Sequence, residues 1–290
     1  MAIFVEQKTI RHSISCFGVG IHSGKPTSLT LYPAPENSGI TFIRTDITNK
    51  LNKIKATYSN VSKTKLGTTI SNEEGVEVAI IEHLMSALWG CKIDNVVIEL
   101  DGPEIPIMDG SAESFVFMVE CAGVQTQKAT RKCIEILKTI SIQDGDSLIE
   151  LSPAEHFSIE TIIDFNDKVI SSQKYTFSEK DKSFKHDIAR ARTFGFEHEG
   201  EMLKKLGLAK GASLENAVVI SNDKILNKEG LRYKDEFVRH KLLDLIGDFY
   251  LAGSPIKAHV KSYKPGHTIN NKFLHKLFST PDAFRIVDAA

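Results

Sequence analysis

A strand-turn-strand pattern occurs once in each half of this 290-residue chain. The first copy alternates apolar and polar residues over 9–16 and over 28–32, with several glycines between the two runs. The second copy covers 133–141 and 148–152 around a Gln-Asp-Gly-Asp turn, and both copies are followed by Pro-Ala. Alternation with a period of two is typical of half-buried strands. Its recurrence in the same form indicates a duplicated unit.

Each copy of the pattern continues toward a helix and then a strand. Residues 79–89 have the periodicity of a helix and precede an apolar run at 95–100, and residues 235–251 precede a similar run at 256–263. Sheets and helices must bury their apolar faces against one another. We therefore expect an α+β fold of two similar lobes, each a β-sheet packed with helices, with the active site at their interface.

The polar residues 123–132 follow a helix-like stretch and indicate a boundary between the lobes. We expect a first lobe at 1–125 and a second at 126–290. The second lobe carries an inserted segment near 195–220, in which a loop containing Gly211 runs into an apolar strand. An insertion of this kind forms a lid, lines a passage for a long ligand, or is ordinary edge structure.

Charge and composition exclude several kinds of partner. Lys and Arg number 36 and Asp and Glu 37, so the chain has no overall field that would attract nucleic acid. No apolar run approaches the roughly 18 residues of a membrane span. The four cysteines form no CxxC pair and the N-terminus does not resemble a signal peptide, so we expect a reducing compartment, the cytoplasm. We expect a monomer.

A histidine and a carboxylate suggest a metal site on the second predicted helix. His240 and Asp244 are separated by four residues, which places both side chains on one helix face. A catalytic zinc usually takes three protein ligands and leaves one position open. His83, in the equivalent helix of the first half, is the best third candidate. Each feature alone also fits an ordinary helix-surface ion pair or a helix start.

Other titratable groups suit the chemistry of hydrolysis. Glu82 precedes His83 and is placed to act as a base beside a metal. His267, in a predicted turn, could protonate a leaving amine or neutralise an oxyanion, and Asp248 could hold it charged. Thr193 lies among arginines and aromatics and could donate a hydrogen bond to an oxyanion. A turn histidine in solvent and a strand with core aromatics are the ordinary alternatives.

Six motifs in one order resemble a known family. They are GVGIHSG (18–24), EHL (82–84), PEIPIMDGS (103–111), RARTFGF (190–196), DEFVRHKLLD (235–244) and KPGH (264–267). From about residue 5 to residue 278, the chain resembles the UDP-3-O-acyl-N-acetylglucosamine deacetylases, zinc enzymes of the committed step of lipid A synthesis in Gram-negative bacteria. The family has Gly-Gly-Ser where this chain has Gly211-Ala212-Ser213, which puts the accepted acyl length in doubt.

The resemblance implies a role for each candidate residue. His83, His240 and Asp244 match the zinc ligands, and Glu82 matches the general base. His267 matches the general acid or electrostatic stabiliser, and Asp248 matches its partner. Thr193 matches the hydroxyl beside the oxyanion. Contacts with the substrate are implied for Lys241, Lys264, Phe194, Asp164 and Phe165.

The implied reaction is zinc-dependent removal of the acetyl group from UDP-3-O-(3-hydroxyacyl)-N-acetylglucosamine. Two alternatives stay open: another zinc amidohydrolase, or a module that binds a nucleotide sugar or lipid without catalysis. A structural metal site in such a module would be closed by four protein ligands. Iron binds the same kind of ligand set, so zinc is an expectation.

Overall fold

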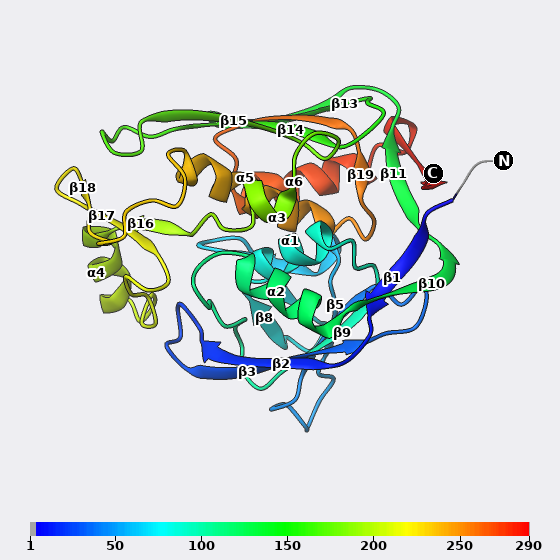
Figure 1. Ribbon diagram of the computed structural model, residues 1–290, viewed down its shortest axis with the longest axis horizontal. Helices are drawn as coiled ribbons and strands as arrows, with labels where there is room; N and C mark the ends of the chain where they lie inside the picture. The colour runs from blue at the N-terminus through cyan, green and yellow to red at the C-terminus, as the bar shows by residue number, and fades with distance from the viewer. Residues whose placement is uncertain (1–3, 290) are drawn as a thin grey trace.

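Two five-stranded sheets lie on opposite sides of a central layer of helices (Figure 1). The computed structural model describes residues 4–289. In order across the sheet, the first contains β2 (Ile14–Val19), β3 (Pro26–Pro33), β9 (Val96–Leu100), β4 (Ile40–Arg44) and β5 (Lys53–Lys55). The second contains β12 (Ile140–Asp144), β13 (Ser147–Ser152), β20 (His259–Tyr263), β14 (Ser158–Asp164) and β15 (Ser172–Ser178).

The two sheets have the same topology. In each, the first two strands form an antiparallel hairpin whose second strand pairs antiparallel with the central strand, β9 or β20. The central strand then pairs parallel with the first strand of another antiparallel hairpin. Five strands with identical order and directions confirm the duplicated α+β unit that the sequence predicts.

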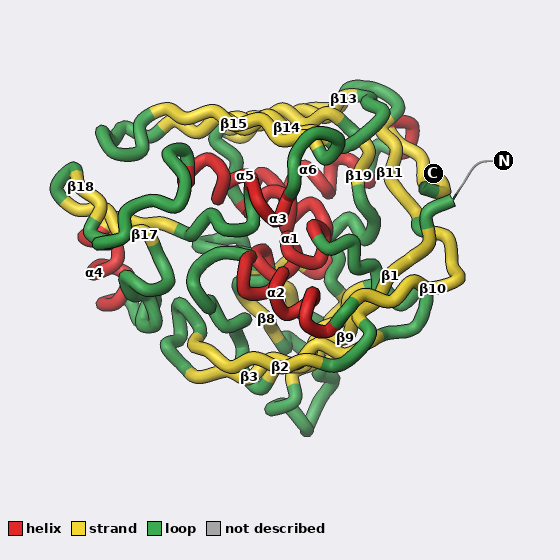
Figure 2. The backbone as a smooth tube through the Cα atoms, viewed as in Figure 1, coloured by secondary structure: helices red, strands yellow, loops and turns green. Residues whose placement is uncertain are grey.

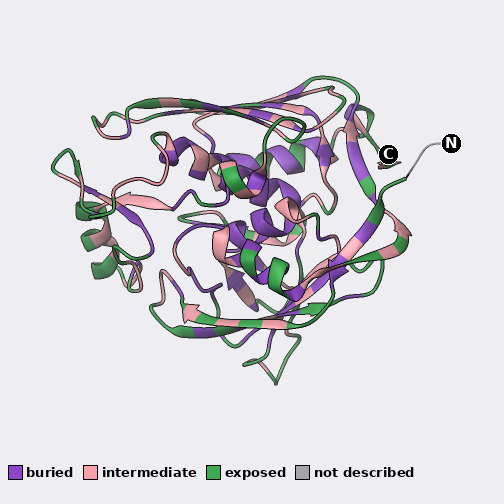
Figure 3. Ribbon diagram, viewed as in Figure 1, coloured by how far each residue is buried: buried purple, intermediate pink, exposed green. Residues whose placement is uncertain are grey.

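Four long helices fill the space between the sheets. They are α1 (Glu82–Gly90), α2 (Glu113–Ala122), α5 (Glu236–Tyr250) and α6 (His267–Phe278). In each half one helix precedes the central strand and one follows it, so α1 corresponds to α5 and α2 to α6. Buried residues concentrate on these helices and on the sheet faces toward them (Figure 3).

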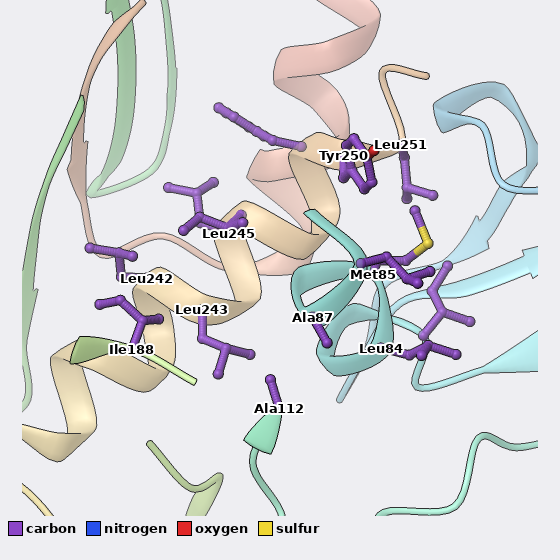
Figure 4. Close-up of a cluster of buried hydrophobic side chains, with 14 of the residues drawn as sticks. Leu84, Met85, Ala87, Ala112, Ile188, Leu242, Leu243, Leu245, Tyr250 and Leu251 are labelled. Carbon is purple, nitrogen blue, oxygen red and sulfur yellow. The ribbon is translucent and has the colours of Figure 1, made fainter. Parts of the chain in front are cut away.

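The two equivalent helices α1 and α5 pack directly against each other. Ala87 of α1 points toward Leu243 of α5, and Met85 lies near Tyr250 and Leu251 at the end of that helix (Figure 4). Gly247 allows the close approach, because a Cβ atom there would lie 2.0 Å from the carbonyl oxygen of Glu82. The contact brings the N-terminal turn of α1 beside the middle of α5.

Each half also carries a three-stranded sheet in the stretch of chain before its α1 or α5 helix. The first contains β6 (Val61–Lys63), β7 (Thr69–Ser71) and β8 (Glu77–Ala79). The second contains β16 (Phe194–Phe196), β17 (Val218–Ser221) and β18 (Lys224–Ile225). Together with α4 (Glu197–Lys205) it covers the segment in which the sequence predicts an insertion, and this part projects from one end of the molecule (Figure 2). The short helix α3 (Phe184–Asp187) precedes it.

Two segments that the sequence predicts as single strands each form two strands in the structure. The alternating runs at 9–16 and 133–141 are each split, because the chain leaves one sheet and enters another within them. Thus β1 (Glu6–Ile10) precedes β2, and β11 (Lys132–Ile136) precedes β12. Alternation marks which residues are buried and does not mark a change of sheet.

The polar stretch at the predicted boundary is a strand. β10 (Val124–Thr130) pairs antiparallel with β1, so its polar side chains lie on a two-stranded ribbon. The exact lobe boundary stays a prediction. β11 pairs with β19 (Ile256–Lys257) and with β21 (Phe284–Asp288), which brings the C-terminal strand back beside the start of the second half. Across the described part of the chain, none of the helices combines the length and the hydropathy that a bilayer-spanning segment requires.

Candidate active site

Two histidines and an aspartate meet where α1 packs on α5. His83 lies in the first turn of α1, whereas His240 and Asp244 lie one turn apart on α5. The Nε2 atoms of His83 and His240 lie 3.6 and 3.3 Å from Asp244 Oδ1. One candidate ligand atom from each residue falls within 4.8 Å of the others. The three predicted ligands are therefore brought together by helices from the two halves.

The chemistry of these side chains fits a metal ion. Asp244 Oδ1 is buried and has no hydrogen-bond partner within the described residues, although the two imidazoles face it. His240 Nδ1 lies 2.9 Å from the carbonyl oxygen of Ala191, which fixes that nitrogen as the donor and leaves Nε2 free to coordinate. Burial lowers the pKa of His240 to about 3, so the ring is neutral, as a ligand must be.

Glu82 lies beside the three candidate ligands, and one of its carboxylate oxygens is hydrogen-bonded to the backbone. Its Oε2 accepts a hydrogen bond from the backbone N–H of Thr68 at 3.0 Å. Its Oε1 lies 3.7 Å from Nε2 of His267. Burial raises the pKa of Glu82, and the charge of His267 opposes that increase. A buried carboxylate with one oxygen free is suited to accept a proton.

His267 is held by a buried carboxylate on α5. Its Nδ1 lies 2.8 Å from Asp248 Oδ2. Burial disfavours the charged ring, but the carboxylates of Asp248 and Glu82 outweigh this effect and raise the pKa of His267 to about 9. The sequence predicts a turn at His267, and this prediction is wrong. The helix α6 starts directly after Gly266, so His267 is its first residue.

Thr193 and Phe194 form the wall opposite α1. The backbone N–H of Thr193 donates to the carbonyl oxygen of Gly110, and its carbonyl oxygen accepts from the N–H of Val218, both at 2.8 Å. The ring of Phe194 packs against Phe237, with centroids 4.9 Å apart. These contacts fix the backbone of Thr193 and the ring of Phe194, and both residues line the cavity that contains the candidate metal site.

Two adjoining cavities of different character share this wall. One has a volume of about 420 Å³ and is lined by the site residues together with polar groups such as Lys241, Lys264 and Thr268. The other has a volume of about 460 Å³ and extends under the insertion, where its lining includes Phe196, Leu203, Ala212, Ala217, Val219 and Leu226. Both cavities are lined by Leu66, Glu82, His83, Thr193 and Phe194.

The remaining predicted contacts lie at different distances from the site. Lys241 Nζ donates to Asp244 Oδ2 at 2.9 Å. Lys264 also lines the polar cavity, and its Nζ lies 3.4 Å from Asp164 Oδ2. Asp164 is exposed and lines neither cavity, and Phe165 packs behind Phe194 with centroids 5.9 Å apart.

The chain is similar throughout to one group of proteins. The family model described as LpxC, UDP-3-O-acyl N-acetylglycosamine deacetylase, matches residues 7–279. The chain belongs to this family. A UDP-3-O-acyl-N-acetylglucosamine deacetylase of Myxococcus xanthus is 48% identical over 98% of this chain and 90% of its own length. Proteins of that name from Acidithiobacillus ferrooxidans and Neisseria meningitidis are each 46% identical, over 99% and 98% of this chain and 94% of their own lengths.

Sequence reasoning missed two residues of this LpxC family member that bond to the carboxylates of Asp248 and Glu82. Thr68 Oγ1 donates to Asp248 Oδ1 at 2.5 Å while its backbone N–H holds Glu82. Asn270 Nδ2 donates to Asp248 Oδ2 at 2.8 Å. Both are single uncharged residues without a recognisable motif around them. The only sequence signal for Asn270 is its spacing of three from His267, which places both on one face of α6.

Proposed function

We propose that this chain is a zinc-dependent hydrolase of the cytoplasm that removes the N-acetyl group from UDP-3-O-(3-hydroxyacyl)-N-acetylglucosamine. The products are the free 2-amino sugar and acetate, in the committed step of lipid A synthesis. Family membership supports the activity. The observation that carries the mechanism is that Glu82 Oε1 and His267 Nε2 lie 3.7 Å apart in the lining of one cavity, next to three clustered ligand atoms.

His83, His240 and Asp244 would hold the zinc ion. A single carboxylate among two neutral imidazoles leaves the site with net positive charge, which preserves Lewis acidity. When bound, zinc makes water a stronger nucleophile at neutral pH and polarises the acetyl carbonyl. Iron suits the same donors, and metal analysis of the purified protein distinguishes the two.

The protons are handled by the chain's own side chains. Glu82 Oε1 accepts the proton of the attacking water, while Thr68 keeps the other oxygen of that carboxylate occupied. His267 Nε2 and the Thr193 hydroxyl donate to the oxyanion that forms when the acetyl carbonyl is attacked. The C–N bond then breaks, and the leaving nitrogen takes a proton from His267 Nε2 or from Glu82.

The two cavities suit the two ends of the substrate. The apolar cavity under the insertion would take the acyl chain. Lys241 and Lys264 would meet the sugar and the diphosphate in the polar cavity. We place the uridine near Asp164 and Phe165, beyond Lys264. The acetyl amide of the substrate, where the two cavities adjoin, then lies next to Glu82 and Thr193.

Acetate release from the nucleotide-sugar substrate tests this proposal. The protein is assayed as isolated, after chelation and after Zn²⁺ is added back, with Glu82→Ala compared with Glu155→Ala, an exposed carboxylate outside the site. We expect activity to follow zinc and to be lost only in Glu82→Ala. Hydrolysis of other amides without acetate release would favour a different amidohydrolase. Zinc and substrate binding without turnover would favour a binding module.

A further inference from the structure

A fully buried ion pair lies directly behind the candidate metal site. Arg192 is 2% exposed and Glu236 is 0% exposed. Arg192 Nε and Nη2 donate to the two oxygens of Glu236 at 2.9 and 3.2 Å. The rest of the guanidinium donates to Glu229 and to the carbonyl oxygen of Gly230, at 2.8 and 2.7 Å. Every nitrogen of the guanidinium therefore has an acceptor.

Each carboxylate oxygen of Glu236 also accepts a hydrogen bond from a backbone N–H group. Its Oε1 accepts from the N–H of Arg192 at 3.0 Å, and its Oε2 accepts from the N–H of Arg232 at 2.6 Å. Removing two charges from water costs several kcal/mol for each ion, so a buried pair is a poor means of gaining stability alone. Its location suggests a different use.

Arg192 and Glu236 are sequence neighbours of the two residues whose hydrogen bond orients the His240 ring, Ala191 and His240 itself. Ala191, whose carbonyl oxygen is 2.9 Å from His240 Nδ1, directly precedes Arg192. Glu236 lies on α5, one helical turn before His240. Arg192 and Glu236 therefore connect the segment just before β16, which carries the acceptor, to the helix that carries the ring. Thr193 directly follows Arg192, so the same contact restrains its hydroxyl.

Arg232 extends the network to the first half of the chain. Its Nη1 donates to Asp109 Oδ2 at 2.7 Å and to the carbonyl oxygen of Arg190 at 3.0 Å. The next residue, Gly110, accepts the backbone hydrogen bond of Thr193. The first-half segment that supports Thr193 is thus tied to the second-half segment that supports His240.

We propose that Arg192 and Glu236 are positioning residues that fix the imidazole of His240 and the hydroxyl of Thr193 for metal binding and oxyanion stabilisation. This inference rests on the proposed function for the role of Thr193. Lys in place of Arg192 keeps the charge but loses the planar fork and most of its donors. Ala191 and Thr193 then gain freedom, and partners that orient metal ligands typically account for 10–100-fold in metal affinity or activity.

The experiment compares Arg192→Lys and Glu236→Gln with Arg44→Lys. Arg44 is 7% exposed and makes the same kinds of bond, two to Asp46 at 2.8 and 2.7 Å and one to the carbonyl oxygen of Glu77 at 2.7 Å. It lines neither cavity of the site. Arg192→Lys and Arg44→Lys therefore share the cost of replacing a buried arginine that is paired with a carboxylate, although Asp46 is more exposed than Glu236. Only the Arg192 and Glu236 variants disturb the site.

Co²⁺ is bound to each metal-free protein, and its d–d absorption spectrum and its affinity in competition with a chelator are measured. We expect Arg192→Lys and Glu236→Gln to alter the spectrum and weaken binding about 10–100-fold. In acetate release, kcat should fall with little change in KM. Arg44→Lys should keep the wild-type spectrum and affinity. If Arg192→Lys does not fold, Glu236→Gln decides the matter.

Unchanged spectra and affinities in both site variants would overturn the inference, as would an equal effect of Arg44→Lys. The cobalt measurements need no substrate, so they stay informative if the wild-type protein binds metal and releases no acetate. That result would refute the proposed function separately.

Discussion

His267 bonds to Asp248 through one ring nitrogen, at 2.8 Å, and presents the other to Glu82 at 3.7 Å. The ring therefore lies between two buried carboxylates from different helices. Its positive charge lowers the cost of keeping both carboxylates ionised in the interior. Thr68 and Asn270 complete the hydrogen bonds of Asp248, so the charged state of the ring is supported from several sides.

The pH dependence of activity should report this arrangement. His267 has a pKa raised to about 9, so its positive charge is fully present at neutral pH and is lost as pH rises through 9. Asp248→Asn removes the largest favourable contribution, and the pKa should fall toward its ordinary value. The alkaline limb of the kcat profile should then move to lower pH, whereas Asp46→Asn should leave it in place. An unmoved limb in Asp248→Asn would contradict this assignment.

Metal binding should raise the thermal stability of the wild-type chain. A ligand that binds only the folded state at 100 times its Kd adds about 2.7 kcal/mol to the free energy of unfolding. Calorimetry with and without Zn²⁺ measures the resulting increase in Tm. His83→Ala should lose most of the increase, and His12→Ala, an exposed histidine, should keep it. An equal increase in both variants would place the stabilising ion elsewhere.

The apolar cavity should set the accepted acyl length. Ala212 lines this cavity, and a phenylalanine there would occupy part of its volume of about 460 Å³. We expect Ala212→Phe to lower kcat/KM for substrates with long acyl chains at least tenfold more than for short ones, since lost or blocked methylene contacts are worth about 1–3 kcal/mol in a pocket. Met202→Phe is the matched control, because Met202 is 60% exposed and does not line the cavity. Equal losses for all chain lengths would argue against an acyl passage.

The close contact of α1 with α5 should not tolerate a methyl group. In Gly247→Ala the new Cβ would lie 2.0 Å from the backbone oxygen of Glu82, so the helices must move apart. Overpacking of this kind costs about 1–3 kcal/mol, which urea unfolding would detect. Gly200→Ala on α4 meets nothing within 4 Å and should stabilise the chain slightly. A neutral Gly247→Ala would mean that the helices separate without strain.

The sequence predicted the elements that repeat and the groups with strong chemical character. Helices are found at both predicted places, although the first begins at Glu82 and residue 79 belongs to β8. Spacing on one helix puts His240 beside Asp244, and His83 joins them because α1 packs against α5. The roles of these residues stay predictions. Periodicity did not indicate where the chain changes sheet, nor that a polar stretch would pair as β10.

The hydrogen-bond partners of Asp248 and the helical position of His267 were beyond sequence reasoning for a physical reason. Thr68 reaches Asp248 across a separation of 180 residues, and this pairing exists only because the fold brings the residue before β7 to α5. His267 was expected in a turn because Pro265 and Gly266 interrupt the pattern, yet the helix starts at once. Thr68 and Asn270 contact Asp248 only because of their positions in the fold, and the residues around them in the sequence do not indicate these contacts.

The repeated topology has a consequence for the completeness of the site. One helix of an equivalent pair gives Glu82 and His83, and the other gives His240, Asp244 and Asp248. Neither equivalent helix therefore holds a complete set of ligands without the other. Severed halves of this protein should accordingly regain the ion only by associating.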